Sequence, residues 1–254
     1  MSLFPQQEKQ DDFAKLNKLI YGFPKTGKST FASLMKDKDG KPPAFISTED
    51  GHGALAVNAR RVTSWDGFLR LVEAIKAEST AIKTQFSCFV IDLVSDLDEM
   101  CAAYVCKQNN VKSLADLEHG KGWFIHKTQF RAALNELNGV LPCSYICHSI
   151  EKELNWNNEK IKAQSPDLGK QCLQYVNGKV DLIMWIAPAN SKKEYPELIM
   201  KNTTTCLAGS RFPQLVRNFQ FKPDKLEDTY SEISKIFAAG VAETIKPSQE
   251  GVTQ

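Results

Sequence analysis

The nine residues from Gly22 to Thr30 (GFPKTGKST) constrain the fold of this chain more than any other feature. They fit the pattern G-x-x-x-x-G-K-[ST], they follow the apolar run KLIY at residues 18–21, and they lead into a helix-forming segment. A glycine-rich loop between a strand and a helix lets backbone N–H groups approach phosphate oxygens, and the helix N-terminus adds its partial positive charge. The sequence therefore predicts a phosphate-binding loop at the end of a buried strand.

Apolar runs that alternate with helical patterns predict the rest of the fold. The predicted strands are KLIY (18–21), AFIS (44–47), SCFVI (87–91), SYIC (144–147) and VDLIMWI (180–186). Near-continuous apolar runs of this length are typical of strands buried on both faces, as in a parallel sheet. Their alternation with helices predicts an α/β domain with a mostly parallel, doubly wound sheet. From about Tyr195, two shorter extended pieces predict antiparallel C-terminal strands.

Two segments with apolar residues at helical spacing predict two helices. One runs from Phe68 to Ile75 with Ser64 placed to cap its start, and the other runs from Leu226 to Phe237. No linker is rich enough in Gly, Pro or Ser to separate two domains. We therefore expect one domain over residues 17–240, between a flexible N-terminal segment (1–16) and a flexible tail (241–254).

The composition limits the class of protein. The chain has 254 residues, of which 42% are hydrophobic, and a net charge of +2, so it is neither disordered nor fibrous. No apolar run approaches the roughly 20 residues that cross a bilayer, and the polar N-terminus predicts no signal peptide. The seven cysteines form no CxxC pair, which indicates buried thiols in a reducing compartment. We expect a soluble cytoplasmic protein, with His52, His119 and His126 on its surface because they show no ligand spacing.

The phosphate-binding loop predicts a nucleotide ligand together with a metal ion. Lys28 can reach the β- and γ-phosphates, and the Ser29 hydroxyl can ligate Mg²⁺. Asp92 ends the buried run SCFVID, where a carboxylate can complete the metal shell through water. We therefore expect ATP and Mg²⁺ as cofactors. The expected nucleotide-binding residues are Gly22, Phe23, Pro24, Lys25, Thr26, Gly27, Lys28, Ser29 and Thr30.

Polar residues that end two other predicted strands are candidate catalytic groups. Glu49 ends the second strand, and if the second and third strands flanked the first, it would face the γ-phosphate opposite the loop backbone. A carboxylate there can polarise the attacking water as a general base or an orienting group. Asp50, next to it, is the alternative. His148 ends the fourth strand, where it can contact the γ-phosphate or its water and pass a change into the following loop.

The loop, Glu49, Asp92 and His148, in that order and spacing, resemble the RecA-like P-loop NTPase core. Softer motifs resemble the minimal RecA-like ATPases of phages, a group of AAA-type nucleotide-binding proteins that includes single-strand annealing and recombination proteins. These motifs are Gly120-Lys-Gly-Trp123, His148-Ser149, Pro166-Asp-Leu and Ser210-Arg211. The resemblance covers residues 18–222. The chain departs from the bacterial recombinase at two places, where His148 stands for a glutamine and Leu93 for a serine.

The resemblance implies a role for each candidate residue. Lys28 and Ser29 would bind phosphate and Mg²⁺, Asp92 would complete the metal shell, Glu49 would activate water, and His148 would be the polar sensor. It also implies an assembly, because in RecA-like cores a basic residue of the neighbouring subunit completes the phosphate site. Arg211 and Lys201 are the candidates for this role, and Arg211 is favoured because its guanidinium suits phosphate.

The resemblance further implies ATP hydrolysis stimulated by DNA, and a ring or filament of identical subunits in the host-cell cytoplasm. The expected partners are single-stranded DNA and a single-strand DNA-binding protein. Two loops would bind DNA, at residues 107–122 and 150–166, and the second would be poorly ordered in the free protein. The candidate DNA-binding residues are Lys112, Lys121, Lys152, Trp156, Lys160 and Lys162. Trp156 lies in a polar run, where an exposed indole could stack on a base.

Charge does not decide between DNA and other partners, since the lysines of both loops alternate with acidic residues. One alternative is a P-loop ATPase that acts on a protein partner, such as a helicase loader or a remodelling motor. A small-molecule or nucleotide kinase is disfavoured, because such an enzyme needs an arginine-rich lid and residues 107–170 contain only Arg131.

Overall fold

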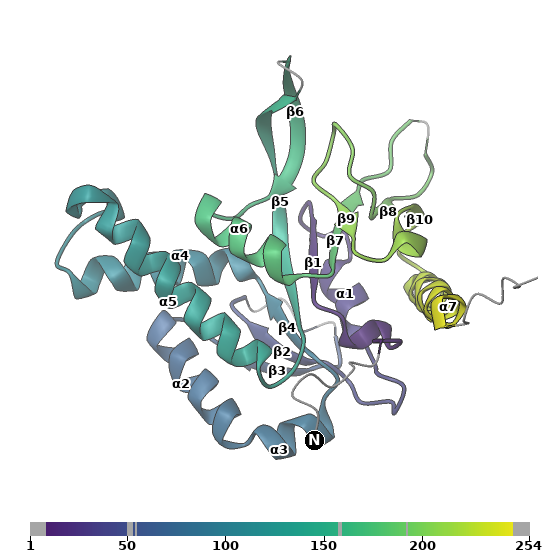
Figure 1. The fold of residues 1–254 in the computed structure, drawn as a ribbon, viewed down its shortest axis with the longest axis horizontal. Coiled ribbons are helices and arrows are strands. Elements are labelled where there is room, and N and C mark those ends of the chain that lie inside the picture. Colours follow the sequence, from purple (N-terminus) through teal and green to yellow (C-terminus); the bar gives the residue numbers. More distant parts are fainter. Residues whose placement is uncertain (1–8, 50–52, 54, 157–158, 192, 246–254) are drawn as a thin grey trace, which may run out of the picture.

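A computed structural model describes residues 9–49, 53, 55–156, 159–191 and 193–245 of the chain. These residues form a ten-stranded sheet with helices on both faces (Figure 1). The strands are β1 (Lys18–Gly22), β2 (Ala44–Ser47), β3 (Asn58–Arg61), β4 (Phe89–Asp92), β5 (Cys143–Trp156), β6 (Glu159–Pro166), β7 (Leu182–Ala187), β8 (Glu197–Ile199), β9 (Gly209–Ser210) and β10 (Asn218–Gln220). The helices are α1 (Lys28–Ser33), α2 (Trp65–Ala77), α3 (Ser79–Gln85), α4 (Val94–Gln108), α5 (Lys121–Asn138), α6 (Lys170–Lys179) and α7 (Leu226–Ile245). Short 3₁₀ turns are η1 (Phe13–Lys15), η3 (Leu114–Asp116), η4 (Glu118–Gly120) and η5 (Pro213–Leu215).

The sheet is mostly parallel, as predicted. Its order is β10-β8-β7-β1-β5-β4-β2-β3, with β6 paired to β5 and β9 paired to β7. The strands from β7 to β3 pair in parallel, whereas β8, β9 and β10 pair antiparallel at the C-terminal side. The predicted fold class, an α/β sheet with antiparallel C-terminal strands, is therefore confirmed.

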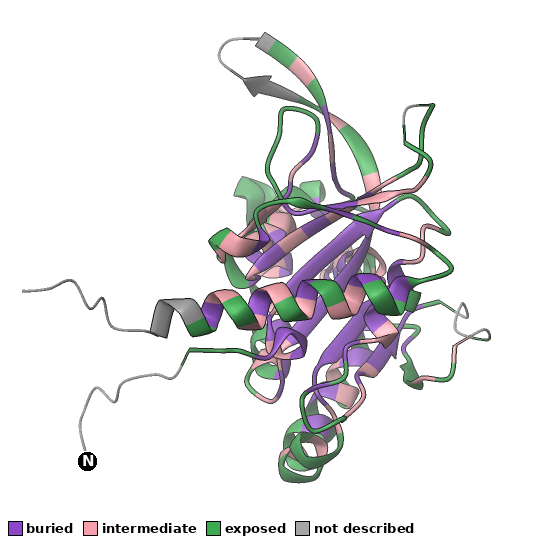
Figure 2. Ribbon diagram, turned by 90° about the vertical axis from the view of Figure 1, so that its right-hand side faces the viewer, coloured by how far each residue is buried: buried purple, intermediate pink, exposed green. Residues whose placement is uncertain are grey.

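Successive residues of the central strands point to opposite faces and supply two hydrophobic cores. Tyr21 belongs to the core under α2, α4, α5 and α6, and Ile20 belongs to the core under α1 and α7. Figure 1 shows the first group of helices on one side of the sheet and α1 and α7 on the other. In Figure 2 the buried strands lie behind α7, whose exposed residues face outward. The predicted helix around Phe68 is α2, and Ser64 caps its start as expected, because its side chain accepts a hydrogen bond from Gly67 N.

The strand order differs from the arrangement assumed for Glu49. The strands that flank β1 are β5 and β7, so β5 separates the phosphate-binding loop from β4, and β2 lies one strand further away. The assumption that the second and third predicted strands flank the first is therefore wrong. All of these strands are parallel, however, so their carboxyl ends still meet at one edge of the sheet.

The folded region extends past both predicted boundaries. Phe13 is buried near the N-terminus and packs edge-on against Tyr230 and Phe237 of α7. At the other end α7 continues to Ile245, and Val241 is 4% exposed. Phe13, Ala14 and Leu16, together with Val241 of α7, are thus part of a hydrophobic core. The outer parts of the predicted flexible segments, residues 1–8 and 246–254, lie outside the described residues.

The expected loop at residues 150–166 is a β-hairpin, named here the arm. Strands β5 and β6 pair antiparallel from Ser149 opposite Pro166 to Trp156 opposite Glu159. The arm projects beyond the edge of the sheet (Figure 1). Cross-strand ion pairs lie along it, from Lys160 to Glu153 and from Lys162 to Glu151. The prediction of a poorly ordered loop is therefore wrong for the described residues of this segment.

Among the described residues, no helix is both long enough and apolar enough to span a bilayer.

The start of β1 contains a buried lysine that should make stability depend on pH. Lys18 is fully buried, its Nζ donates to the carbonyl oxygens of Ala14 (3.2 Å) and Leu16 (2.8 Å), and burial lowers its pKa to about 8 from 10.5. Between these pH values the unfolded chain binds more protons than the folded one, so the free energy of unfolding rises with pH. The stability of the wild type relative to Lys18→Met should therefore increase by about 3 kcal/mol across this range. Urea unfolding of both proteins measures this difference, and a constant difference would contradict the burial effect.

Candidate functional site

The phosphate-binding loop leaves the carboxyl end of β1 in a tight turn. Gly22 pairs with His148 of β5 on one side and with Ile186 of β7 on the other. A Cβ atom on Gly22 would lie 2.9 Å from the Ile186 carbonyl oxygen, so a side chain does not fit there. Gly27, which directly precedes α1, has a φ of 85°, a conformation that favours glycine. Both glycines of the motif are therefore required by the backbone.

Lys28, the first residue of α1, is held inside this loop. It is 5% exposed, and its Nζ donates to the carbonyl oxygens of Gly22 (3.2 Å) and Phe23 (2.8 Å). Burial lowers the pKa of the Lys28 ammonium, while Asp92, Cys147 and Glu49 act in the opposite direction. A buried cation whose partners are neutral carbonyls favours an anionic ligand in the same loop.

Ser29 and Asp92 meet across the site although they are 63 residues apart in the sequence. The Ser29 hydroxyl donates to Asp92 Oδ2 at 2.6 Å, and Asp92 is 4% exposed at the end of β4. A hydroxyl and a carboxylate oxygen are the kind of ligands that Mg²⁺ takes. The donor set therefore fits the predicted metal site, with Ser29 and Asp92 as the residues that would hold the ion.

Thr48 is a further residue of this site, and the sequence analysis missed it. Its Oγ1 donates to Asp96 Oδ2 (2.6 Å) and accepts from Leu93 N (2.9 Å), and its backbone N–H donates to the Asp92 carbonyl (2.8 Å). Thr48 thus binds both backbone groups of the peptide between Asp92 and Leu93, and it holds the end of β4 against the end of β2. A lone threonine after a strand carries no sequence signal that would distinguish it.

Glu49 follows at the same edge of the sheet. Its carbonyl oxygen accepts from Ser47 Oγ at 2.6 Å, and its side chain is exposed. The carboxylate lies near enough to Lys28 to raise the pKa of the ammonium. Glu49 therefore lies on the Lys28 side of the site even though two strands separate β2 from β1. Asp50, the alternative, lies outside the described residues.

His148 lies between the phosphate-binding loop and the arm. It is half-buried beside Gly22, and its backbone oxygen accepts from Asp167 N (2.9 Å), just beyond β6. Its Nδ1 is buried and has no hydrogen-bond partner among the described residues.

Arg211 does not lie beside the phosphate-binding loop of its own chain. It follows β9, which pairs with Leu182 and Ile183 at the start of β7, whereas Gly22 pairs with Ile186 near the end of β7. The guanidinium contacts Asp181 Oδ1 (3.3 Å) and donates to the Gly178 carbonyl (2.9 Å). Lys201, the other candidate, is exposed after β8.

The candidate DNA-binding residues form two separate groups. Lys112 is exposed between α4 and α5, before η3 and η4, and Lys121 is exposed at the first position of α5. The other four lie on the arm: Lys152, Trp156, Lys160 and Lys162. Lys152 donates to the Leu168 carbonyl (3.4 Å), and the two lysines of β6 are paired with glutamates. The side chain of Trp156 lies outside the described part of the chain.

Comparisons with known proteins identify the family of the chain. The sequence profile of the AAA domain family matches residues 14–212. No curated protein matches the chain. Among solved structures, 118 chains are similar to it, and one of these is described as the RadB recombinase. That structure is 15% identical with a TM-score of 0.45, and the alignment covers 82% of this chain and 88% of the other.

Proposed function

The chain belongs to the AAA domain family, and from this premise we propose that it is an ATPase that binds ATP with Mg²⁺ and hydrolyses it. The observation that carries the proposal is the 2.6 Å contact between Ser29 and Asp92 beside a loop that encloses Lys28. A phosphate-binding loop, a buried cation and a metal-ligand pair thus occupy one edge of the sheet.

Each residue of this edge has a definite task in the proposal. The backbone N–H groups of residues 22–30, apart from Pro24, and the Lys28 ammonium bind the phosphate oxygens, and Ser29 and Asp92 would hold Mg²⁺. The metal ion neutralises charge on the transferred phosphoryl group. Glu49 accepts a hydrogen bond from the attacking water and orients it. His148 responds to the γ-phosphate through its ring, next to Gly22.

We further propose that the arm binds single-stranded DNA under the control of this site, in a homo-oligomer that promotes strand annealing or recombination, as in the phage group. Tyr21 of β1 supports such coupling, because its hydroxyl contacts the Gln164 carbonyl (3.1 Å) at the base of the arm and the Leu207 carbonyl (2.7 Å). Arg211, or else Lys201, would complete the nucleotide site of the neighbouring subunit. Such a protein would act in the host-cell cytoplasm, beside a single-strand DNA-binding protein.

The charge of the arm favours a second candidate function. Residues 149–166 contain three lysines (152, 160 and 162) and three glutamates (151, 153 and 159), so the net charge is zero. Phosphate contacts supply most of the affinity of sequence-independent DNA binding, and a neutral arm supplies few. A P-loop ATPase that acts on a protein partner, such as a helicase loader or remodelling motor, would not need a basic arm.

Trp156→Ala separates these two functions. If Trp156 stacks on a base, the variant should bind single-stranded DNA about 1 to 3 kcal/mol more weakly in the presence of ATP, with its basal ATPase rate unchanged. Anisotropy of a labelled oligonucleotide measures the affinity, which should also fall as the salt concentration rises.

Trp123→Ala is the comparison variant, since Trp123 is 49% exposed on α5 beside Lys121, and a loss of DNA affinity in this variant alone would place stacking at the other proposed DNA segment. Equal DNA affinity in wild type and Trp156→Ala would remove stacking from the proposal. Absence of DNA binding at any salt concentration, in protein that has bound ATP, would favour the protein partner instead.

A further inference from the structure

Three helices on the face of the sheet opposite α1 bring together a carboxylate, an imidazole and a thiol. They come from Asp98 of α4, His126 of α5 and Cys172 of α6, which are 7%, 4% and 1% exposed. One ligand atom of each lies within 4.8 Å of the other two. His126, which the sequence analysis placed on the surface, is therefore buried, whereas His119 is exposed and His52 lies outside the described residues.

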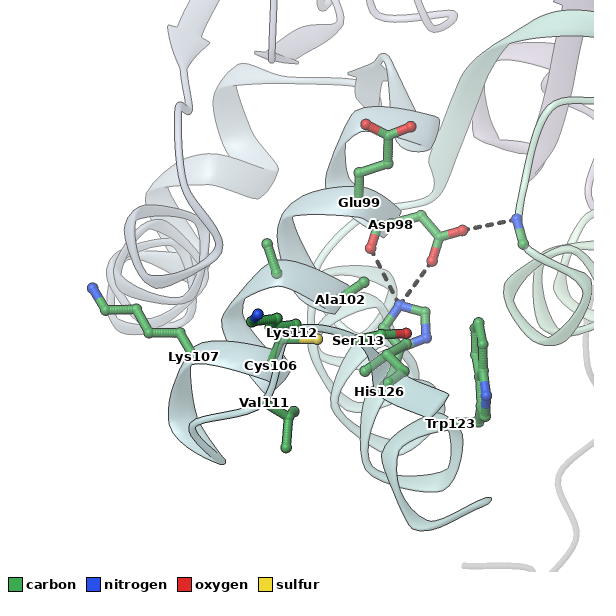
Figure 3. A pocket seen from close by; sticks show the side chains of 13 residues that line it. Asp98, Glu99, Ala102, Cys106, Lys107, Val111, Lys112, Ser113, Trp123 and His126 are labelled. Carbon is green, nitrogen blue, oxygen red and sulfur yellow. Dashed lines mark hydrogen bonds and ion pairs between the residues drawn. The ribbon is translucent and has the colours of Figure 1, made fainter. Parts of the chain in front are cut away.

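Hydrogen bonds within the protein do not satisfy this cluster completely. His126 Nε2 lies 2.9 Å from Asp98 Oδ1 and 3.2 Å from the Asp98 backbone oxygen (Figure 3). Asp98 Oδ2 accepts from Gly169 N at 2.8 Å. Asp98 Oδ1 is thus paired with the imidazole, whereas His126 Nδ1 is buried without a hydrogen-bond partner in the described part of the chain. A buried carboxylate beside an imidazole nitrogen that has no partner favours a cation in the cluster.

An open pocket gives access to the cluster from solvent. It has a volume of about 650 Å³ and lies between α4 and α5, and Asp98, His126 and Trp123 are among the residues that line it (Figure 3). An ion could enter through this pocket, and water in it could supply a ligand that the protein does not.

We propose that Asp98, His126 and Cys172 bind one Zn²⁺ ion, with a water molecule from the pocket as the fourth ligand. Zinc takes sulfur, nitrogen and carboxylate ligands in a tetrahedron, whereas Mg²⁺ and Ca²⁺ require oxygen. Zinc–ligand bonds of about 2.0 to 2.3 Å place tetrahedral ligand atoms about 3.3 to 3.8 Å apart. The observed separations, from 2.9 Å to at most 4.8 Å, need only small side-chain movements to reach this range.

Binding would change the protonation of one residue and link three helices. Burial, with Asp98 nearby, raises the pKa of the Cys172 thiol, so the thiol is protonated in the metal-free protein. The incoming Zn²⁺ takes the sulfur lone pair, and the thiol proton passes to solvent. The ion would then tie α4, which begins just after Asp92, to α6, which follows the arm. This site is independent of the proposed nucleotide site.

Elemental analysis and cobalt spectroscopy test the proposal on the full chain. After equilibration with Zn²⁺ and dialysis into metal-free buffer without chelator, the wild type should retain about one zinc per chain. Co²⁺ in its place should give a sulfur-to-cobalt charge-transfer band in the near ultraviolet. Ser29 and Asp92 offer oxygen only, so Co²⁺ bound there gives no such band.

The charge-transfer band should disappear in Cys172→Ser and persist in Cys106→Ser, because Cys106 lines the same pocket but lies outside the cluster. Asp98→Asn should reduce zinc retention at least about tenfold, the order reported for weakened metal sites. Circular dichroism checks that each variant is folded.

Wild-type protein that retains no zinc, or that binds Co²⁺ without a charge-transfer band, would overturn the proposal without bearing on ATP binding. Persistence of the band in Cys172→Ser would also overturn it.

Discussion

Lys28→Ala is expected to weaken ATP binding at least about 30-fold while the protein stays folded. Truncating one partner of a buried charge pair typically costs about 2 to 5 kcal/mol, and about 2 kcal/mol corresponds to this factor. The ammonium is 5% exposed, so its contact with phosphate would be poorly screened by water. The fold should survive, because the hydrogen bonds of Lys28 go to two loop carbonyls and the residue is not a member of either hydrophobic core. Titration of a fluorescent ATP analogue measures the affinity.

Lys36→Ala is the matched control, since Lys36 is exposed just beyond α1 and has the same charge. Its ATP affinity should equal that of the wild type. If folded Lys28→Ala protein bound ATP as tightly as the wild type, the loop would not be the nucleotide site.

Glu49→Gln is expected to hydrolyse ATP at least about tenfold more slowly and to bind it with nearly unchanged affinity. The substitution keeps the shape of the side chain but removes the carboxylate that would orient or deprotonate water, and general bases contribute about 10²- to 10⁴-fold to rates. Glu49 acts on Lys28 electrostatically without a hydrogen bond in the structure, so the loop itself should be undisturbed. Single-turnover hydrolysis and equilibrium ATP binding, measured on the same preparation, separate the two effects.

Asp50→Asn is the comparison variant for this experiment. Normal turnover in Glu49→Gln together with slow turnover in Asp50→Asn would move the catalytic role to the neighbouring residue. Normal turnover in both variants would remove the end of β2 from the mechanism.

The strands that support the site were predictable because burial on both faces makes them continuous apolar runs. The same reasoning failed for strands without such burial. All four residues of β3 are exposed, and in the arm charged and polar residues separate the few apolar ones, so neither has a continuous apolar run. In the arm, cross-strand pairs such as Lys162 with Glu151 replace the burial that a central strand provides.

The arrangement of the site depended on information that local sequence does not contain. The position of β5 between β1 and β4 follows from how the crossovers pack, and composition does not reveal it. The sequence could nevertheless predict that Lys28, Ser29 and Asp92 lie together, because parallel strands present their carboxyl ends at one edge in any order. His126 was wrongly placed on the surface, and Thr48 was missed, because the partners of both residues are far away in the sequence. The partner of His126, Asp98, is 28 residues away and becomes a neighbour only when α4 packs on α5.

The most direct test of the account is the rate of phosphate release from ATP by the purified protein, with and without Mg²⁺ and with and without single-stranded DNA. The account predicts turnover that requires Mg²⁺, that accelerates when single-stranded DNA is added, and that is lost in Lys28→Ala. Turnover that Mg²⁺ supports but DNA leaves unchanged would contradict the coupling of the arm to the nucleotide site. A rate no higher than that of Lys28→Ala under every condition would contradict the central claim that this protein is an ATPase.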